Sequence, residues 1–500
     1  MLAIFIIFFF YLCLAAAFAA TSDHNVLLKS ALSVAGGSVY HPSKSSSTAL
    51  CGTTNGTLSS SILEDGGINE STTTKKRPLR VLFLSADTGG GHRASAESLA
   101  RQFQIHFPGS TYDLLDVWTL DGVYPYKTLV KSYTHLSAHP KHWSLFYHSS
   151  NIFPVGSLAN IHSNVLCGRR IKRRIAGYDP DVIVSVHPAM NNAPRIATRK
   201  LMKEHGKYIP FFTVVTDLGS GHSHWFEKKV DKLYVASERI FKLARRRGRT
   251  PSQNIVMTGL PIRQDFALQS QKLNGDRTTE DGKKYQKQVK TNLSLSNDRP
   301  MVLVMGGGEG VGSLSQIVDQ LHDKFVANDI DATICVVCGR NEKLQTELKE
   351  KDWNKNNKSG STVEVIGLGY VDKMADYMVA ADVLVSKAGP GTIAEAAAVG
   401  LPVMMTSFLP GQEAGNVDVV IDAGFGEYCK RPSKIASRVS EWLKDEALLQ
   451  KMSQRATQMG NPTAASDIVL DIGTITQAWI DANLEASNGK RKSILSSSSR

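Results

Sequence analysis

The hydrophobic pattern of the chain predicts two successive blocks of alternating strands and helices. Short apolar runs rich in β-branched residues recur between helical patterns over about 80–260 and again over about 300–430. Such runs are typical of strands buried on both faces of a parallel sheet. In each block the first run, 80–85 or 300–305, leads directly into glycines and then a helical pattern. We therefore expect two Rossmann-like, doubly wound α/β domains facing a cleft.

The same pattern sets the expected domain boundaries. We place the first domain at 78–266, a polar linker at 267–298, and the second domain, with a terminal helix, at 299–484. Residues 485–500 are Ser-rich and basic and are expected to form a disordered tail.

The N-terminal segment has the composition of a two-part leader. Residues 1–20 are almost wholly apolar and end in small residues, which predicts a signal peptide, although an uncleaved anchor stays open. Residues 21–77 are Ser/Thr-rich without sustained periodicity, as disordered transit peptides are. Such a leader resembles those of proteins sent to plastids of secondary origin. On the leader alone, a secreted or endoplasmic-reticulum protein fits equally well.

The stretch 387–398, Lys-Ala-Gly-Pro-Gly-Thr-Ile-Ala-Glu-Ala-Ala-Ala, predicts a tight turn and a helix after a buried strand. Gly389 and Gly391 allow the backbone to approach a ligand closely, with Thr392 near the helix start. Amide groups of a first helical turn, together with the helix dipole, bind phosphate. Alone, the motif fits an ordinary strand-to-helix connection as well.

A second polar turn follows at 408–416. Gln412, Glu413 and Asn416 place an amide, a carboxylate and a second amide on this glycine-bearing segment. These groups suit sugar hydroxyls, which both donate and accept hydrogen bonds. A phosphate cradle and a hydroxyl-binding turn in one domain indicate a nucleotide-sugar.

In the first domain, His92 follows three glycines after the first strand. Doubly wound folds bind ligands at the carboxyl ends of their strands, and a histidine there suits proton transfer. A lone histidine is more often structural.

The next region, 116–164, mixes aromatic residues with lysines and histidines. This composition fits a segment at a membrane interface, with core packing of the rings as the alternative.

The net charge of +12 and the pI of about 9.2 indicate an anionic partner. Nucleic acid is the usual first candidate, but an anionic bilayer or a diphosphate would serve equally.

The six cysteines lack disulfide-framework spacing, and Cys335 and Cys338 are expected as buried strand residues. His222 and His224 have no third ligand fixed by spacing, so we expect no metal site.

Four motifs in order, SADTGGGHRAS (85–95), MGGGEGVG (305–312), KAGPGTIAEA and PGQEAGN, together resemble the monogalactosyldiacylglycerol synthase family. That family belongs to the GT-B glycosyltransferases, which include the bacterial lipid-intermediate transferase of peptidoglycan synthesis. The resemblance covers roughly 77–482. It implies a GT-B fold, a terminal helix that returns to the first domain, and transfer of galactose from UDP-galactose to sn-1,2-diacylglycerol with inversion.

The resemblance also implies roles for single residues. His92 would be the general base, Arg263 would bind the diphosphate, and Glu395 would bind the ribose. Pro125 and Trp225 would contact the lipid acceptor or an activating lipid. The implied UDP-sugar site comprises Arg263, Gly307, Gly308, Glu309, Gly310, Arg340, Tyr370, Val371, Gly389, Pro390, Gly391, Thr392, Glu395, Gln412, Glu413 and Asn416.

We expect no required cofactor or metal and no nucleic-acid partner. The expected partners are a UDP-sugar, diacylglycerol and an activating anionic phospholipid, phosphatidylglycerol or phosphatidic acid. With the leader, the resemblance predicts peripheral attachment to a plastid envelope membrane, reached through the secretory route. A homodimer stays open. The alternatives are a lipid transferase using a glucosyl or N-acetylglucosaminyl donor, a UDP-sugar epimerase, and a catalytically silent UDP- or lipid-binding membrane protein.

Overall fold

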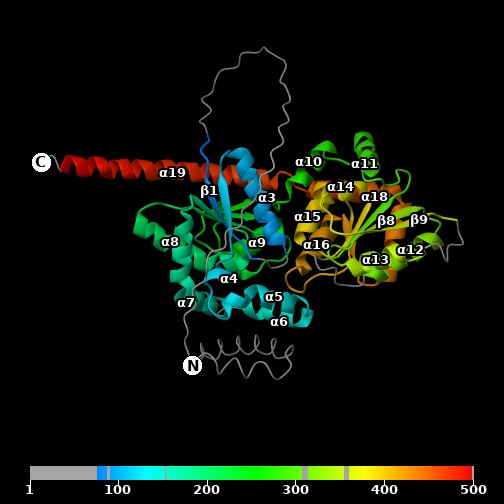
Figure 1. Cartoon of the computed structure of the whole chain (residues 1–500), viewed down its shortest axis with the longest axis horizontal. Coiled ribbons are helices and arrows are strands. Elements are labelled where there is room, and N and C mark those ends of the chain that lie inside the picture. The colour runs from blue at the N-terminus through cyan, green and yellow to red at the C-terminus, as the bar shows by residue number, and fades with distance from the viewer. Residues whose placement is uncertain (1–75, 87–89, 153–154, 307–313, 354–359, 498–500) are drawn as a thin grey trace, which may run out of the picture.

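The computed structural model describes residues 76–86, 90–152, 155–306, 314–353 and 360–497, with side chains up to 486 (Figure 1). The predicted leader and residues 307–310 of the predicted glycine loop therefore lie outside the described residues, apart from the last two leader residues. The described chain forms two α/β domains side by side, as Figure 1 shows. Their arrangement confirms the predicted fold class.

The first domain is built on a parallel sheet of six strands. In chain order these are β1 (Arg80–Leu84), β2 (Thr111–Leu115), β3 (Val182–Ser185), β4 (Phe211–Val214), β5 (Leu233–Val235) and β6 (Ile255–Met257). Their order across the sheet is β2-β1-β3-β4-β5-β6. Along β1, Leu82 and Leu84 pack into one core cluster and Val81 and Phe83 into another. Both faces of the sheet are thus buried, which explains why the strands are almost wholly apolar.

Helices cover both faces of this sheet. They are α3 (Gly91–His106), α4 (Val117–Asp121), α5 (Leu129–Ser137), α6 (Pro140–Ser150), α7 (Val155–Tyr178), α8 (Asn192–His205) and α9 (Glu238–Arg246). The segment predicted to lie at a membrane interface forms α4 to α6 and the start of α7. In Figure 1, α5 and α6 lie at one end of the first domain and reach toward the second.

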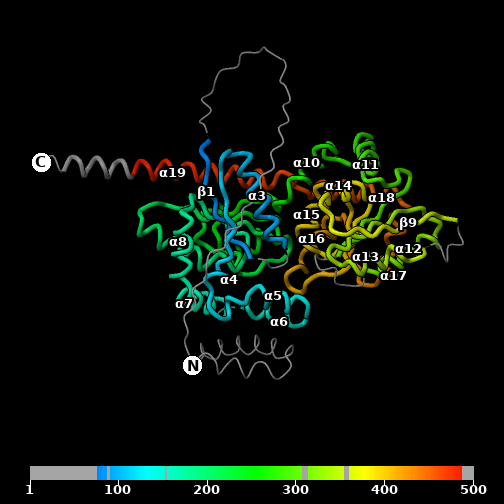
Figure 2. Tube along the Cα trace, in the orientation of Figure 1, coloured from blue at the N-terminus to red at the C-terminus, as the bar shows by residue number. Residues whose placement is uncertain are grey.

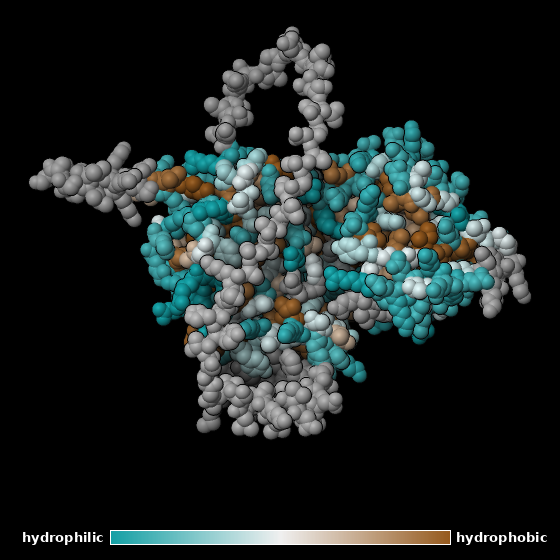
Figure 3. All heavy atoms as spheres, viewed as in Figure 1, coloured by the Kyte–Doolittle hydropathy of each residue, from teal (hydrophilic) through white to brown (hydrophobic). Residues whose placement is uncertain are grey.

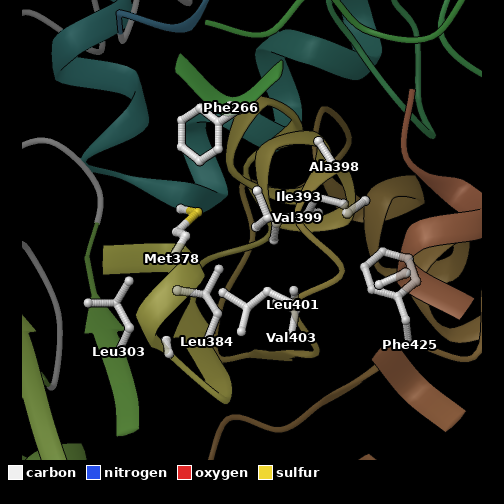
Figure 4. Close-up of a cluster of buried hydrophobic side chains, with 14 of the residues drawn as sticks. Phe266, Leu303, Met378, Leu384, Ile393, Ala398, Val399, Leu401, Val403 and Phe425 are labelled. Carbon is white, nitrogen blue, oxygen red and sulfur yellow. The ribbon is translucent and has the colours of Figure 1, made fainter. Parts of the chain in front are cut away.

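The second domain repeats the architecture. Its strands are β7 (Met301–Met305), β8 (Ala332–Val337), β9 (Val363–Leu368), β10 (Val383–Ser386), β11 (Val403–Met405) and β12 (Gly426–Tyr428), in the parallel order β12-β11-β10-β7-β8-β9. Its helices are α12 (Leu314–Ala327), α13 (Glu342–Glu350), α14 (Met374–Ala380), α15 (Pro390–Ala398), α16 (Ala414–Ala423), α17 (Pro432–Lys444) and α18 (Glu446–Met459). Figure 4 shows Met378 of α14 and Ile393 of α15 packed over the strand residues Leu303 and Leu384.

The segment predicted as a linker forms two helices, α10 (Gln264–Lys272) and α11 (Glu280–Asn292). Both pack on the second domain, because Phe266, Leu273 and Val289 belong to its core cluster (Figure 4 labels Phe266). The predicted terminal helix is α19 (Ala464–Ser497), which crosses back over the first domain (Figure 2). There Ile468 and Ile472 enter the first domain's core.

None of the helices among the described residues is long and apolar enough to cross a bilayer. The face of the molecule in Figure 3 is mostly hydrophilic, with apolar side chains in separate patches. One such patch follows α19. On this helix Trp479 stacks on Tyr208 of the first domain with ring centroids 3.9 Å apart.

A buried arginine ties α14 and α15 together. Arg277 lies between α10 and α11, is 6% exposed, and donates to the carbonyl groups of Val379 at 2.8 Å, of Val399 at 3.4 Å and of Ala381. These carbonyls lie at the C-terminal ends of the two helices, where the helix dipole favours a positive charge. Arg277 thereby fixes the helix that carries the predicted phosphate cradle.

We predict that Arg277→Met lowers the free energy of unfolding by roughly 2–4 kcal/mol, because buried carbonyls lose their donors. The measurement is urea unfolding followed by circular dichroism. Arg245→Met, at an exposed position of α9, is the matched control and should change stability by less than about 0.5 kcal/mol. Equal effects of the two substitutions would contradict the assigned role.

Candidate active site

A cavity of about 1300 Å³, counted with its open mouth, lies where α5 and α6 approach the second domain. Aromatic side chains form much of its wall. Those that line it are Trp118, Tyr126, Tyr133, Trp143, Phe146 and Tyr147. Polar groups contributed by both domains line it as well: His92, His187 and Asp217 from the first domain and Gln412 from the second. The cavity therefore joins an apolar wall to a small polar region at the domain junction.

His92 lies in the first turn of α3, as the glycine motif predicts. Its Nδ1 lies 2.6 Å from the Thr216 hydroxyl, which donates in turn to the Val186 carbonyl at 3.5 Å. The His92 ring also forms a hydrogen bond with the Val186 carbonyl, and we assign the ring proton to Nδ1, on the side of Thr216. In this tautomer Nε2 keeps a lone pair and can accept a proton.

The surroundings of His92 favour its neutral form. Burial lowers the pKa of His92 to about 4. The ring of His187 packs edge-on against it with centroids 4.6 Å apart, and burial holds the pKa of His187 well below its ordinary value too. Both rings are therefore uncharged near neutral pH. An uncharged imidazole at a cavity wall can act as a general base.

The predicted phosphate cradle is the turn from β10 into α15. Gly389 is the N-cap residue, Pro390 begins the helix, and Thr392 lies in its first turn. No heavy atom lies within 4 Å of a Cβ built on Gly391, so the backbone there is open to a ligand. The amine of Lys387 lies 3.8 Å from the Cβ position of Gly389 and forms an ion pair with Glu413 at 2.7 Å. Lys387 thus adds a positive charge beside the cradle, a role the sequence-based site did not include although the residue is part of the motif.

Arg263 and Glu395, predicted to bind diphosphate and ribose, bind each other in this structure. The guanidinium donates to both carboxylate oxygens of Glu395, at 2.7 and 3.0 Å. The pair joins the end of the first domain to α15. Burial raises the pKa of Glu395, while the Arg263 guanidinium acts in the opposite direction. Their roles toward a nucleotide stay predictions.

The turn predicted to bind sugar, 408–416, also makes contacts of its own. Glu413 accepts from the backbone amide of Leu409 at 2.8 Å in addition to pairing with Lys387. Asn416 uses both ends of its amide, donating to the Ala388 carbonyl at 2.9 Å and accepting from the Gly219 amide at 2.8 Å. Of the three residues predicted to bind sugar hydroxyls, Gln412 lines the cavity.

A close contact between two glycines joins the domains beside this turn. A Cβ on Gly219 would lie 1.9 Å from the Gly415 carbonyl oxygen, and a Cβ on Gly415 would lie 2.3 Å from that of Gly219. The Gly415 amide donates to the Ser220 hydroxyl at 2.8 Å. We call the contact of 219–220 with 415–416 the glycine seam. Only glycine permits backbones to approach this closely.

The two residues predicted to contact lipid lie near His92. Pro125 lines the cavity. Trp225 is fully buried, with its ring centroid 5.9 Å from that of His92. Its indole N–H donates to Asp217 at 2.6 Å. Of the two, Pro125 can touch a ligand in the cavity, whereas Trp225 supports polar groups behind the wall.

The remaining predicted donor residues lie elsewhere. Arg340 is exposed after β8, and Tyr370, 76% exposed, and Val371 follow β9 at the edge of the sheet. The Gly339 amide donates to the Gly369 carbonyl at 3.2 Å and holds these two loops side by side. Arg340, Tyr370 and Val371 therefore lie on neighbouring loops, and none of them lines the cavity. Gly307, Gly308, Glu309 and Gly310 lie outside the described residues.

Sequence reasoning left Asp217 and Thr216 out of the predicted site. Both follow β4 at its carboxyl end, the position where doubly wound sheets bind ligands, which was an available signal. The rings of His222 and His224 meet edge to face with centroids 4.6 Å apart, and the His222 Nε2 lies 3.0 Å from the Ser150 hydroxyl. Among the described residues, no group of three or more His, Cys, Asp or Glu side chains could hold a metal ion.

Two facing parallel-sheet domains with a polar site at their junction define the GT-B fold. The solved structure of MurG from Acinetobacter baumannii shares this fold, with a TM-score of 0.52 and 16% identity, covering 79% of this chain and 100% of that one. Residues 301–468 match the glycosyltransferase family 28 C-terminal domain, and residues 92–262 match the family described as monogalactosyldiacylglycerol (MGDG) synthase.

Two plant relatives agree with this match. The chain is 36% identical over 426 residues to the chloroplastic monogalactosyldiacylglycerol synthase of Spinacia oleracea, covering 84% of this chain and 77% of the relative. It is 34% identical over 427 residues to monogalactosyldiacylglycerol synthase 1, chloroplastic, of Arabidopsis thaliana, covering 84% and 74%. The chain belongs to the monogalactosyldiacylglycerol synthase family and is an enzyme of the glycosyltransferase class, which confirms the predicted family.

We predict that Gly415→Ala lowers kcat/KM for glycosyl transfer at least about tenfold, because the added methyl group would collide with backbone and open the glycine seam. UDP affinity should change less than about twofold, because the predicted phosphate cradle at the start of α15 does not include the seam. The measurements are initial rates and calorimetric UDP binding. Gly168→Ala in α7, where nothing lies within 4 Å of the new methyl group, is the control. Wild-type rates in Gly415→Ala would show that catalysis does not need the seam.

Proposed function

We propose that this enzyme transfers galactose from UDP-galactose to the free hydroxyl of sn-1,2-diacylglycerol with inversion, forming monogalactosyldiacylglycerol. One observation carries this proposal: a neutral buried histidine, His92, lines a cavity that has an aromatic wall and also reaches the second domain. A lipid hydroxyl and an activated sugar can meet there. The names of the relatives support the choice of sugar and acceptor.

The acceptor would enter the aromatic part of the cavity. Its aromatic lining, from Trp118 to Tyr147, suits the glycerol backbone and the start of the acyl chains. Exposed apolar side chains continue the surface along α6 and α7, among them Leu145, Ile161 and Val165. Such side chains would rest in a membrane surface while the acceptor passes into the cavity.

The donor would bind the second domain. Amide groups at the start of α15 and the Lys387 amine would hold the diphosphate, and Arg263 would reach it by leaving Glu395. These positive groups would stabilise the departing UDP, so the reaction would need no metal ion. Gln412 and Glu413 would bind hydroxyls of the hexose beside the cavity.

The chemistry is a single displacement. The acceptor oxygen attacks C1 of the galactose from the face opposite the diphosphate, forming one C–O bond as the bond to the phosphate oxygen breaks. The hydroxyl proton passes to Nε2 of His92, and UDP leaves with the electron pair. Because no enzyme nucleophile intervenes, the anomeric configuration inverts.

The proposed location is a plastid envelope membrane, reached through the secretory route with the two-part leader. Chloroplastic relatives support the plastid. Attachment would be peripheral and favoured by anionic lipid, since Arg170 and Arg173 line a shallow surface depression on α7 beside exposed apolar residues. Activation by phosphatidylglycerol or phosphatidic acid, and the absence of a required cofactor, are parts of the proposal. Formation of a homodimer stays open.

The test is transfer of radiolabelled sugar from UDP-galactose or UDP-glucose into diacylglycerol vesicles, with and without phosphatidylglycerol, by protein lacking the leader. We expect galactolipid to form and its rate to rise with the anionic lipid. A preference for UDP-glucose would make the enzyme a related transferase. Interconversion of UDP-sugars would indicate an epimerase. UDP binding without any turnover would indicate a silent binding protein.

We predict that His92→Ala lowers kcat for this transfer by about 10²–10⁴-fold, because the acceptor hydroxyl loses its base. The Kd for UDP should stay within about twofold, because the histidine does not touch the predicted nucleotide site. His205→Ala, at the exposed end of α8, is the control. Retained turnover in His92→Ala would remove the proposed base.

The pH dependence provides a second check on His92. Its lowered pKa means that the ring loses its catalytic neutral form only as the pH falls through about 4. His92 should therefore not produce an acidic limb in kcat between about pH 5.5 and 8. The measurement is kcat over that range at saturating donor and acceptor. A limb near the ordinary histidine pKa that vanishes in a His92 variant would contradict this assignment.

A further inference from the structure

Asp217 is a buried acid that the proposed displacement does not use. It follows β4, is 4% exposed, and lines the cavity together with His92 and Gln412. One carboxylate oxygen accepts from the Trp225 indole N–H at 2.6 Å. An acid is rarely buried without partners, so its other contacts show what it does.

Gln412 provides the contact from the second domain. Gln412 and Asp217 line the same cavity, and the hydrogen bond that acts to lower the pKa of Asp217 comes from the Gln412 side chain, whose N–H end is the donor. The Gln412 Oε1 atom is buried and has no hydrogen-bond partner within the described parts of the chain. An unpartnered carbonyl oxygen beside a cavity is an acceptor held in place for a ligand hydroxyl.

We propose that Asp217 is a positioning residue that fixes the orientation of the Gln412 amide, so that Gln412 presents its carbonyl oxygen to a hydroxyl of the transferred hexose. This inference rests on the proposed function. The ligand group is a sugar hydroxyl because it can donate to Oε1, whereas a phosphate oxygen cannot.

The orientation follows from the chemistry of the carboxylate. An ionised carboxylate only accepts hydrogen bonds, so it selects the N–H end of the amide and directs the carbonyl end away from itself. A protonated carboxyl can donate instead, and it would then bind Oε1 and turn the amide around. Since Gln412 can rotate by half a turn at little steric cost, the charge of Asp217 decides which end faces the ligand.

The glycine seam holds the two side chains together. Gly219 lies two residues after Asp217, and Gly415 lies three residues after Gln412, so the backbones that carry them touch. The bond from the Gly219 amide to Asn416 at 2.8 Å spans the same contact. The pairing of Asp217 with Gln412 is therefore part of a rigid contact between the domains and not a chance meeting of flexible side chains.

Several groups act on the ionisation of Asp217. Burial and the Glu413 carboxylate raise its pKa to about 7, and the bonds from Trp225 and Gln412 act against that rise. Lys387 faces Glu413 at 2.7 Å and offsets part of its charge. The carboxyl is thus expected to ionise close to neutral pH.

Neutral groups surround Asp217 on its other sides. Burial raises the pKa of the phenols of Tyr133 in α5 and Tyr147 in α6, and the negative charge of Asp217 raises both further. His92 and His222 line the same cavity, and burial lowers the pKa of each. Arg247 of the first domain acts on Tyr147 and His222. Around neutral pH Asp217 is therefore the group here whose charge changes.

The test compares Asp217→Asn with the wild-type protein by calorimetric binding of UDP, UDP-galactose and UDP-glucose, at pH 5.5 and pH 8.5. The substitution keeps the shape but can no longer select one end of the Gln412 amide. At pH 8.5 we expect the affinity for the preferred UDP-hexose to fall about tenfold, while UDP, which lacks the hexose, binds within about twofold of wild type.

The change of UDP-hexose affinity with pH tests the direction of the effect. In the wild type, UDP-hexose affinity should fall as the pH drops through about 7, because the carboxyl takes up a proton and releases Gln412. In Asp217→Asn the affinity should not depend on pH in this range. The control is Asp422→Asn, an exposed acid near the other end of α16.

Two outcomes would overturn the inference. Equal UDP-hexose affinity in Asp217→Asn and wild type would show that Gln412 needs no positioning. A parallel loss of UDP affinity would show a structural role for Asp217. These binding ratios do not depend on turnover, whereas the proposed function fails only if the wild type transfers no sugar to diacylglycerol. The two failures are therefore distinguishable.

Discussion

The contact between Gly219 and Gly415 is the constraint on which the site depends. Each domain alone has a complete sheet and its own core, but the polar region of the cavity exists only where they meet. Because neither glycine has a side chain, the turn after β4 and the turn before α16 approach to backbone contact. That approach brings Asp217 to Gln412 and brings Tyr147 of α6 against Gly411 of the turn predicted to bind sugar. The aromatic wall and the donor domain are thus held together by the same seam.

Exclusion of water gives the site its electrostatic character. His92, His187, His222 and His224 are all kept neutral by burial, whereas burial shifts Asp217 in the opposite direction, toward ionisation near pH 7. Both shifts have one cause, since a low dielectric disfavours the charged form of every group. The wall of the cavity is therefore nearly free of charge, and positive groups lie on the donor side at Lys387 and Arg263. This division suits a reaction that takes an uncharged lipid from one side and a diphosphate from the other.

The fold could be predicted from sequence because it depends on local signals. β-Branched runs, the glycines after β1 and β10, and the helical pattern at the C terminus are each visible within a few residues. Positions of single residues that follow such signals, such as His92 and Gly389, were predicted correctly as to their place in the fold. The ion pair of Arg263 with Glu395 could not be predicted, because the two residues are 132 positions apart in the sequence. Asp217 was missed although its place after β4 was an available signal, whereas its pairing with Gln412 of the other domain could not be read from the sequence.

The path of the chain shows which parts of this assembly can move together. The chain passes to the second domain between Ile262, whose carbonyl binds Ser98 of α3, and Arg263, and returns near Asn461. The two crossings are adjacent, because the Asn461 amide donates to the Thr258 carbonyl at 2.6 Å. A rotation of one domain against the other would therefore bend the chain at one place. It would separate the glycine seam and free Gln412 from Asp217 in a single movement. Contact of the domains and orientation of Gln412 are thus linked by geometry, since the amide meets Asp217 only where the two backbones touch.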